Sequence, residues 1–200
     1  NTEKPDVVVH LAAVTSLNEC KKDPDKANTL HADLTKILAS SCKRMIYVST
    51  DSVFDGVAST PYGETSDANP VNVYAKSKLI GEAAAINNNK NSVIIRTNIF
   101  GCKPGMLADW AIQSYKDNEK IDGYVNVKFN PVYVGDLAIA IRKAIDHDIT
   151  GVINVAGDTC LSKYHFLKLL YKRFSMDTEM IKPKTYDDHG QELKRPKYTC

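Results

Sequence analysis

Short apolar runs alternate along the chain with longer segments whose apolar residues recur at helical spacing. The runs are rich in Val and Ile and cover residues 7–11, 45–48, 93–95 and 152–155. Runs that are apolar throughout are typical of strands buried on both faces, and strands that alternate with helices form parallel sheets. We therefore expect an α/β protein built on a doubly wound parallel sheet, that is, a Rossmann-like fold.

The segments between these runs predict the helices. Residues 23–42, opened by Asp23-Pro24, carry leucines at helical spacing, and further helices are expected at 72–87, 106–116, 136–147 and, capped by Ser162, at 162–174. Residues 50–70 are rich in Gly, Pro, Asp, Ser and Thr and predict a long loop. Residues 125–127 predict a short strand. We expect the catalytic half of a nucleotide-binding domain in 1–100 and a mixed substrate-binding part in 101–200.

Composition excludes several classes of function. The net charge of +2 gives no sign of nucleic acid or a membrane surface as partner, and no run approaches the roughly 18 apolar residues of a membrane span. The five cysteines are scattered, without the spacing of a metal site, and we interpret them as free thiols. The first residues do not form a signal peptide. These features favour a cytoplasmic protein without a bound metal.

Tyr74 and Lys78 form the pattern with the clearest chemistry. Residues four apart on a helix lie on one face, and an ammonium near a phenol lowers the pKa of the phenol from about 10. A tyrosine tuned in this way is a proton donor near neutral pH. Thr50, 24 residues earlier at the end of a strand, can hold the oxygen that receives the proton. Two plainer readings stay open: a surface pair with an extended lysine, and Thr50 as a turn cap.

The residues around this pattern resemble the extended short-chain dehydrogenase/reductases, and most closely the dTDP-4-dehydrorhamnose reductase group. The resemblance rests on motifs that occur in order along nearly the whole chain: residues 5–13, Ser49-Thr50-Asp51 through Gly56, Asn72-Val73-Tyr74, Ser77-Lys78-Leu79 with Gly81-Glu82, Arg96-Thr97 through Gly101, 130–134, and Arg195-Pro196-Lys197.

The resemblance implies roles for individual residues. It implies that Tyr74 is the general acid, that Lys78 lowers the pKa of Tyr74 and binds the ribose of the cofactor, and that Thr50 contacts the substrate carbonyl. The residues implied to bind the cofactor, NADP or NAD with NADPH favoured by the family, are Ala12, Ala13, Thr15, Ser49, Tyr74, Lys78 and Thr97. Those implied to bind the substrate are Asp51, Asn98, Phe100, Asn130 and Arg195. For several of them close packing, turn formation or a solvated charge is an equal alternative.

Two features depart from the family pattern. The chain has no Gly-rich phosphate loop, and the resemblance places that loop and three strands before residue 1. Ser52 stands where the rhamnose-pathway reductases usually have tyrosine. This weakens the case for dTDP-4-dehydrorhamnose as the substrate but does not affect the type of reaction. Ser52 also argues against a dehydratase, since that class tends to have an acidic residue there.

The function implied is NAD(P)H-dependent reduction of a 4-keto sugar nucleotide, by an enzyme that could be a homodimer. Two alternatives stay open: a regulatory subunit like the β subunit of methionine adenosyltransferase, and a sugar-nucleotide epimerase of the same superfamily.

Overall fold

A four-stranded parallel sheet forms the centre of the protein. The computed structural model describes residues 5–187 and 194–199. The strands lie in the order β1-β2-β3-β8, and all pairs are parallel. Their bounds are β1 (Val7–His10), β2 (Arg44–Val48), β3 (Val93–Thr97) and β8 (Gly151–Val155). The prediction of a parallel α/β sheet is therefore confirmed.

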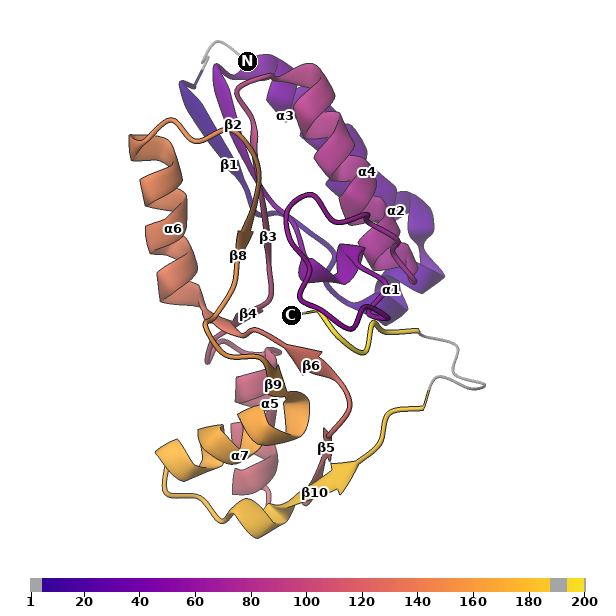
Figure 1. Ribbon diagram of the computed structural model, residues 1–200, viewed down its shortest axis with the longest axis vertical. Coiled ribbons are helices and arrows are strands. Elements are labelled where there is room, and N and C mark those ends of the chain that lie inside the picture. Colours follow the sequence, from indigo (N-terminus) through magenta and orange to yellow (C-terminus); the bar gives the residue numbers. More distant parts are fainter. Residues whose placement is uncertain (1–4, 188–193, 200) are drawn as a thin grey trace.

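Helices cover the two faces of this sheet (Figure 1). One face carries α3 and α4, with α2 and α1 near the other end of this layer, and α6 lies on the opposite face. The bounds are α1 (Leu17–Lys22), α2 (Pro24–Asn28), the π-helical turn η1 (Thr29–Asp33), α3 (Leu34–Ser41), α4 (Val73–Asn88) and α6 (Val134–Asp146). The expected helix at 23–42 is thus one continuous helical stretch with a π turn in its middle.

Successive strand residues face opposite layers, and this divides the core in two. Met45, Tyr47 and Ile94 are fully buried and pack with α3 and α4 residues. Ile46 and Val93, whose side chains point the other way, pack with α6 residues. This two-sided burial is the reason that the strand sequences are apolar throughout rather than alternating.

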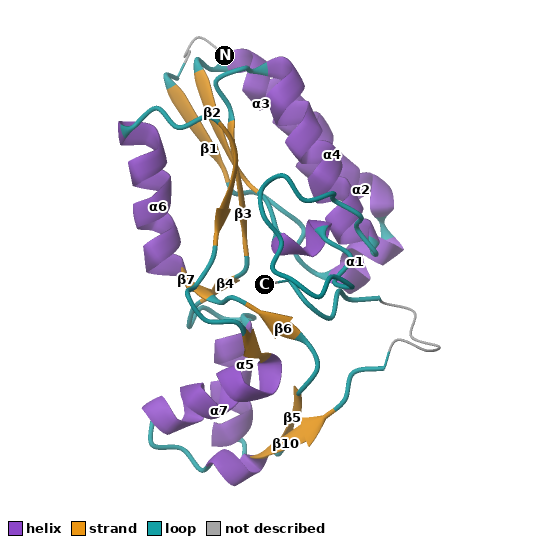
Figure 2. Ribbon diagram, viewed as in Figure 1, coloured by secondary structure: helices purple, strands orange, loops and turns teal. Residues whose placement is uncertain are grey.

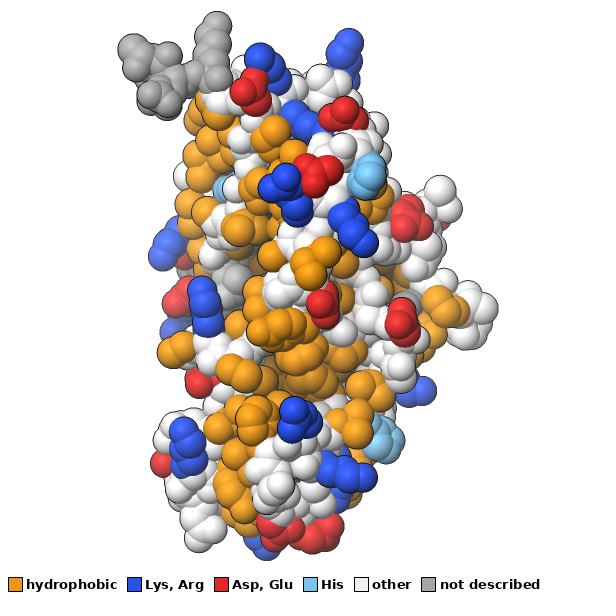
Figure 3. Space-filling model, turned by 90° about the vertical axis from the view of Figure 1, so that its left-hand side faces the viewer, with side chains coloured by type: hydrophobic (Ala, Val, Ile, Leu, Met, Phe, Trp, Pro, Cys, Tyr) orange, Lys and Arg blue, Asp and Glu red, His pale blue; other side chains and the backbone are white. Residues whose placement is uncertain are grey.

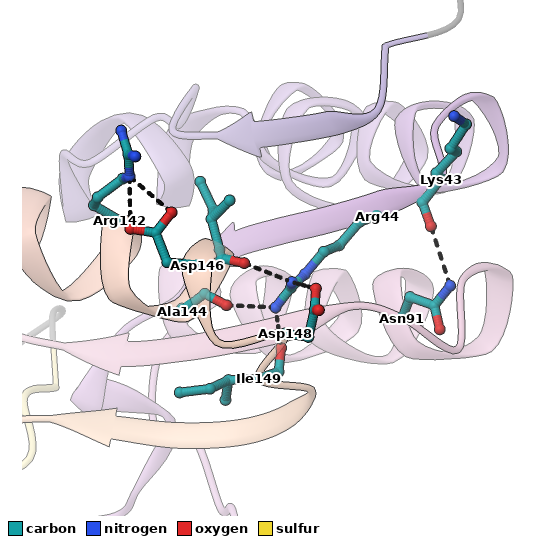
Figure 4. A network of polar contacts seen from close by, with 9 residues as sticks. Lys43, Arg44, Asn91, Arg142, Ala144, Asp146, Asp148 and Ile149 are labelled. Atoms are coloured by element: carbon teal, nitrogen blue, oxygen red, sulfur yellow. Dashed lines mark hydrogen bonds and ion pairs between the residues drawn. The ribbon is translucent and has the colours of Figure 1, made fainter.

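Arg44, the first residue of β2, is hydrogen-bonded to the end of α6 and to the residues that follow it (Figure 4). Its guanidinium donates hydrogen bonds to the backbone oxygens of Ala144 at 2.5 Å, Ile145 at 3.1 Å and Ile149 at 2.5 Å, and it pairs with Asp148 at 2.6 Å. The last carbonyls of a helix have no partner within the helix. A buried arginine supplies them with donors and carries the charge that the helix dipole favours there.

A smaller part lies below the sheet (Figure 2). It contains α5 (Leu107–Lys116), α7 (Lys163–Arg173), the 3-10 turn η3 (Thr178–Met180), the parallel pair β5 (Ile121–Tyr124) and β10 (Ile181–Lys184), and the antiparallel pair β6 (Lys128–Phe129) and β9 (Leu161–Ser162). Two more short strands, β4 (Ile99–Phe100) and β7 (Val132–Tyr133), join it to the sheet. Phe129, Phe166 and Tyr171 are central in its own apolar core.

Two expectations are wrong. Residues 125–127 are not a strand: β5 ends at Tyr124, and the chain bends before β6. The apolar pattern there reflects the burial of Val127, while Val125 pairs with Lys184 through a single backbone hydrogen bond. Cys160 is disulfide-bonded, whereas Cys20, Cys42 and Cys102 are free thiols as expected. Spacing in the sequence does not show which sulfurs the fold brings together.

The surface is uneven in polarity. Hydrophobic side chains gather on the face seen in Figure 3, around the hollow between the upper and lower parts. Val134 and Ile139 of α6 are 38% and 57% exposed. Within the described residues, β1 pairs on one side only, so its second edge is open. In this same part of the chain, every helix is too short or too polar to cross a bilayer.

Candidate active site

Helix α4 presents Tyr74 in its first turn and Lys78 one turn later. Asn72 starts the helix: its side-chain oxygen accepts a hydrogen bond from the Ala75 N–H at 2.9 Å. The same side chain donates to the Lys194 backbone oxygen at 3.1 Å, which ties the C-terminal segment to this end of the helix. The cap therefore fixes where α4 begins, with Tyr74 as the second residue of the helix.

Lys78 lies between α4 and the sheet. It is 3% exposed, its ammonium donates to the Val48 backbone oxygen at 2.7 Å, and the nitrogen is 3.9 Å from the centre of the Tyr47 ring. Burial lowers the pKa of Lys78 to about 7, although Glu82 opposes this. The lysine is therefore close to the point of losing its charge at neutral pH.

Tyr74 is half-buried, and its pKa moves in the direction opposite to our expectation. Burial raises the pKa of Tyr74 to about 12, and the side-chain hydrogen bond with Thr50 only partly offsets this. Loss of hydration outweighs the stabilisation expected from Lys78, whose ammonium is turned towards Val48 and Tyr47. Thr50 is therefore a neighbour of the Tyr74 hydroxyl, and its expected contact with the oxygen that receives the proton stays a prediction.

Thr50 and Asp51 form the turn that closes the site from the sheet side. Thr50 precedes the 3-10 turn η2 (Asp51–Val53), and its hydroxyl accepts a hydrogen bond from the Ser52 N–H at 3.1 Å. The Asp51 carboxylate accepts from the Asn98 amide at 2.8 Å and from the Thr199 hydroxyl at 2.5 Å. Burial raises the pKa of Asp51, and these donors oppose the rise. Thr50 is thus a cap as well as a neighbour of Tyr74.

Ser49 belongs to a buried ion-pair network. Its hydroxyl donates to Glu82 at 2.5 Å, and Glu82 pairs with Arg96 at 2.7 Å. Arg96 and Glu82 are 8% and 3% exposed. Ser49 is not among the residues that border the cavities described below, so its role in cofactor binding stays a prediction.

A cavity of about 560 Å³ brings several predicted residues together. Those that line it are Thr15, Thr50, Tyr74, Thr97, Asn98 and Arg195. A small cavity of about 50 Å³ adjoins it through Thr97 and Asn98 and is also lined by Asp51 and Asn130. The remaining predicted residues, Ala12, Ala13, Lys78 and Phe100, do not border either one, and Phe100 packs on Phe166 with ring centres 5.1 Å apart.

The whole of this chain, residues 1–200, matches the family described as the RmlD substrate binding domain. The chain belongs to the RmlD substrate binding domain family. Its relatives in this group include the spore coat polysaccharide biosynthesis protein SpsK of Bacillus subtilis, 28% identical over 98% of this chain, and dTDP-4-dehydrorhamnose reductase of Mycolicibacterium smegmatis, 28% identical over 97%. Methionine adenosyltransferase 2 subunit beta of Xenopus laevis is 29% identical over 94%. The chain spans 70%, 62% and 60% of the lengths of these three proteins.

Solved structures of RmlD-type reductases superpose closely on this chain. The dTDP-4-dehydrorhamnose reductase of Clostridium acetobutylicum has a TM-score of 0.92 at 28% identity, covering 98% of this chain and 71% of that protein. The reductase of Bacillus anthracis in complex with NADP has a TM-score of 0.91 at 27% identity, with the same coverage. The predicted family is therefore confirmed, together with the Rossmann-like fold.

Sequence reasoning missed a second large cavity. It measures about 480 Å³ and is lined by Trp110, Tyr124 and Ser114, among others. Lys163 and Arg195 border both this cavity and the larger one, so the two share a positively charged wall. The Lys163 ammonium lies 3.2 Å from the centre of the Phe129 ring. The only signal in the sequence was a lysine directly after the helix cap Ser162, which on its own indicates no ligand.

Proposed function

We propose that this chain provides the catalytic and substrate-binding part of an enzyme that reduces the 4-keto group of a sugar nucleotide with NADPH or NADH. The observation that carries the proposal is the shared wall of the two large cavities. A proton donor, Tyr74, lines one cavity, an exposed tryptophan lines the other, and two cations lie between them. A sugar, a diphosphate and a nucleoside need these three environments in this order.

Tyr74 and Thr50 would act on the keto oxygen of the sugar. The two hydroxyls are hydrogen-bonded to each other at the edge of the cavity, so one carbonyl oxygen can contact both. The Tyr74 hydroxyl would give its proton to that oxygen as negative charge develops on it, while Thr50 orients it. The high pKa of Tyr74 keeps the hydroxyl protonated throughout the physiological range.

The residues beside Tyr74 fit the nicotinamide end of a dinucleotide. The Thr97 hydroxyl is buried without a hydrogen-bond partner among the described residues, and Thr97 lines the cavity together with Thr15 at the end of the loop after β1. Open α/β sheets bind ligands at the carboxyl ends of their strands, where these two residues lie. When bound, the reduced nicotinamide supplies a hydride to the substrate. Thr15, Thr97, Tyr74 and Lys78 would hold it against the keto sugar.

Lys163 and Arg195 would bind the phosphates of the substrate. Burial lowers the pKa of Lys163 to about 8, a net shift that the Asp51 charge opposes and the Arg195 charge increases. Two phosphate groups placed between the cations would stabilise the charged form of Lys163. Trp110, 44% exposed beside the second cavity, offers a ring face on which a base can stack. We leave the sugar unspecified because Ser52 replaces the tyrosine that is usual in rhamnose-pathway reductases.

A regulatory subunit is the second candidate, because methionine adenosyltransferase 2 subunit beta is as similar to this chain as the reductases are. We propose a cytoplasmic location for either case, and a homodimer for the reductase. Purification of the protein from its native source distinguishes the candidates. A larger enzyme present in stoichiometric amounts would favour the regulatory subunit.

The direct test supplies the full-length protein with NADPH and a dTDP-4-keto-6-deoxy sugar and follows oxidation of the nicotinamide. We expect consumption of NADPH that depends on the sugar nucleotide. Arg195→Gln should raise KM for the sugar nucleotide about tenfold or more, because a charge-assisted contact to phosphate contributes roughly 1.5–3 kcal/mol. The matched control is Lys194→Gln, since Lys194 is an exposed neighbour that borders neither large cavity. No oxidation with any 4-keto sugar nucleotide would refute the proposal.

A further inference from the structure

His31 lies at the centre of the π-helical turn η1, behind the catalytic helix. It has no exposed surface. The backbone oxygen of His31 accepts hydrogen bonds from the Tyr47 hydroxyl at 3.1 Å and the Thr35 hydroxyl at 2.6 Å. A methyl group added to Gly81 would lie 2.1 Å from this oxygen. The backbone of α4 therefore packs against the turn too closely for any residue other than glycine at this position. Single π turns are often retained at functional sites.

The His31 ring joins two segments that are far apart in the sequence. Its Nε2 atom accepts a hydrogen bond from the Val14 N–H at 3.0 Å, in the loop that follows β1. Its Nδ1 atom lies 2.8 Å from the Ser77 hydroxyl on α4. Ser77 in turn donates to the Tyr74 backbone oxygen at 2.9 Å, and the His31 and Tyr74 rings meet edge to face.

These contacts allow one protonation state. The Val14 N–H is only a donor, so Nε2 must present its lone pair, and the proton of the neutral ring is then on Nδ1. Nδ1–H donates to the Ser77 hydroxyl, which leaves the hydroxyl hydrogen for the Tyr74 oxygen. Each polar atom in this series of contacts has a partner and acts either as a donor or as an acceptor towards it, with no alternative arrangement of protons. Such a closed network holds its members in one arrangement.

We propose that His31 is a positioning residue that fixes the turn of α4 carrying Tyr74 relative to the loop formed by residues 12–15. This rests on the proposed function, in which Thr15 of that loop borders the nicotinamide and Tyr74 delivers the proton. His31 then sets the distance between the cofactor side and the proton donor, without touching either ligand. Nε2 holds the loop at Val14 and Nδ1 holds α4 at Ser77. A substitution that removes one of these contacts and keeps the other therefore separates the effect on the cofactor side from the effect on the proton donor.

Two substitutions each keep one half of the ring's function. His31→Asn places an amide N–H near the position of Nδ1 but is too short to reach Val14. His31→Gln places an acceptor near the position of Nε2 but loses the donor to Ser77. Ser77→Ala removes that same link from the α4 side. His147→Gln, at an exposed histidine after α6, is the matched control.

In the full-length protein we expect His31→Asn to raise KM for NADPH about two- to tenfold, the size of one buried hydrogen bond, with kcat within about twofold of wild type. We expect His31→Gln and Ser77→Ala to lower kcat by about the same factor, with KM for NADPH nearly unchanged. The control should leave both constants at wild-type values. If the Asn and Gln variants change the two constants alike, or change only thermal stability, the ring has a purely structural role and the proposal is wrong.

Nuclear magnetic resonance tests the same inference without any turnover. The wild-type His31 ring should carry its proton on Nδ1 at neutral pH, and the Val14 amide should exchange about two- to tenfold faster in His31→Asn than in His31→Gln. A proton on Nε2, or equal exchange in the two variants, would overturn the proposal. If the enzyme assay fails while the expected exchange pattern is found, the error lies in the proposed function and not in the role of His31.

Discussion

The ammonium of Lys78 lies 3.9 Å from the centre of the Tyr47 ring, on the side of α4 that faces the sheet. Tyr47 is fully buried, and its hydroxyl is bound to the His31 backbone oxygen. The ring therefore forms a fixed platform for the lysine, and burial lowers the pKa of Lys78 to about 7. The charge of Lys78 is thus itself sensitive to pH near neutrality.

The first prediction concerns this charge. We expect activity to fall as pH rises through about 7, because neutral Lys78 no longer stabilises the phenolate that Tyr74 forms on giving up its proton. Lys78→Met should be slow at every pH and should lack this inflection. Lys76→Met, at an exposed lysine of the same helix, is the control and should keep the wild-type profile. The pH–rate profiles of the three proteins give the answer, and an inflection retained in Lys78→Met would exclude the assignment.

The second prediction concerns Tyr74. Tyr74→Phe keeps the ring and removes the proton, so turnover should fall by roughly 10²–10⁴, the usual contribution of general acid catalysis. Binding of the sugar nucleotide, measured by calorimetry, should change little. Tyr62→Phe removes a hydroxyl whose partners among the described residues are Asp55 and nearby backbone N–H groups of the long loop, and should reduce turnover far less. Equal turnover in wild type and Tyr74→Phe would remove Tyr74 from the mechanism.

The sequence predicts most of the sheet because its strands are buried on both faces and are therefore marked by continuous apolar runs. It places Tyr74, Thr50 and Arg195 around one cavity through the family resemblance. It does not predict the direction of the Tyr74 pKa, because burial depends on how the loop at 50–70 and residues 194–199 cover the helix. His31 and Lys163 are missed for a related reason: each gains its partners from segments distant in the sequence.

The third prediction concerns the stability of the fold against acid. Burial, together with the nearby charge of Lys78, lowers the pKa of His31 from 6.5 to about 4. The unfolded state therefore binds more protons between these values. The free energy of unfolding should be unaffected by His31 above about pH 6.5 and should fall, by up to roughly 3 kcal/mol, as pH drops towards 4. Denaturant titrations over this range should show a shallower decline for His31→Asn, and identical slopes would contradict the assignment.

The fourth prediction concerns the end of α6. Arg44→Met removes the guanidinium donors to the carbonyls of Ala144, Ile145 and Ile149, of which the first two keep a backbone N–H donor, and should lower the free energy of unfolding by about 2–4 kcal/mol. The Asp148 side chain is 94% exposed, so Asp148→Asn should cost less than about 1 kcal/mol. Denaturant unfolding of both variants measures the difference. Equal losses would show that the ion pair, and not the carbonyl contacts, stabilises this junction.

Transfer of deuterium tests the central claim most directly. The full-length protein is incubated with NADPH deuterated at the nicotinamide C4 position and with a dTDP-4-keto-6-deoxy sugar, and the product is examined by mass spectrometry and nuclear magnetic resonance. Our account predicts one deuterium on C4 of the sugar, next to a new hydroxyl group, and its loss in parallel with activity in Tyr74→Phe. An unchanged keto sugar, or a reduced sugar without deuterium at C4, would contradict it.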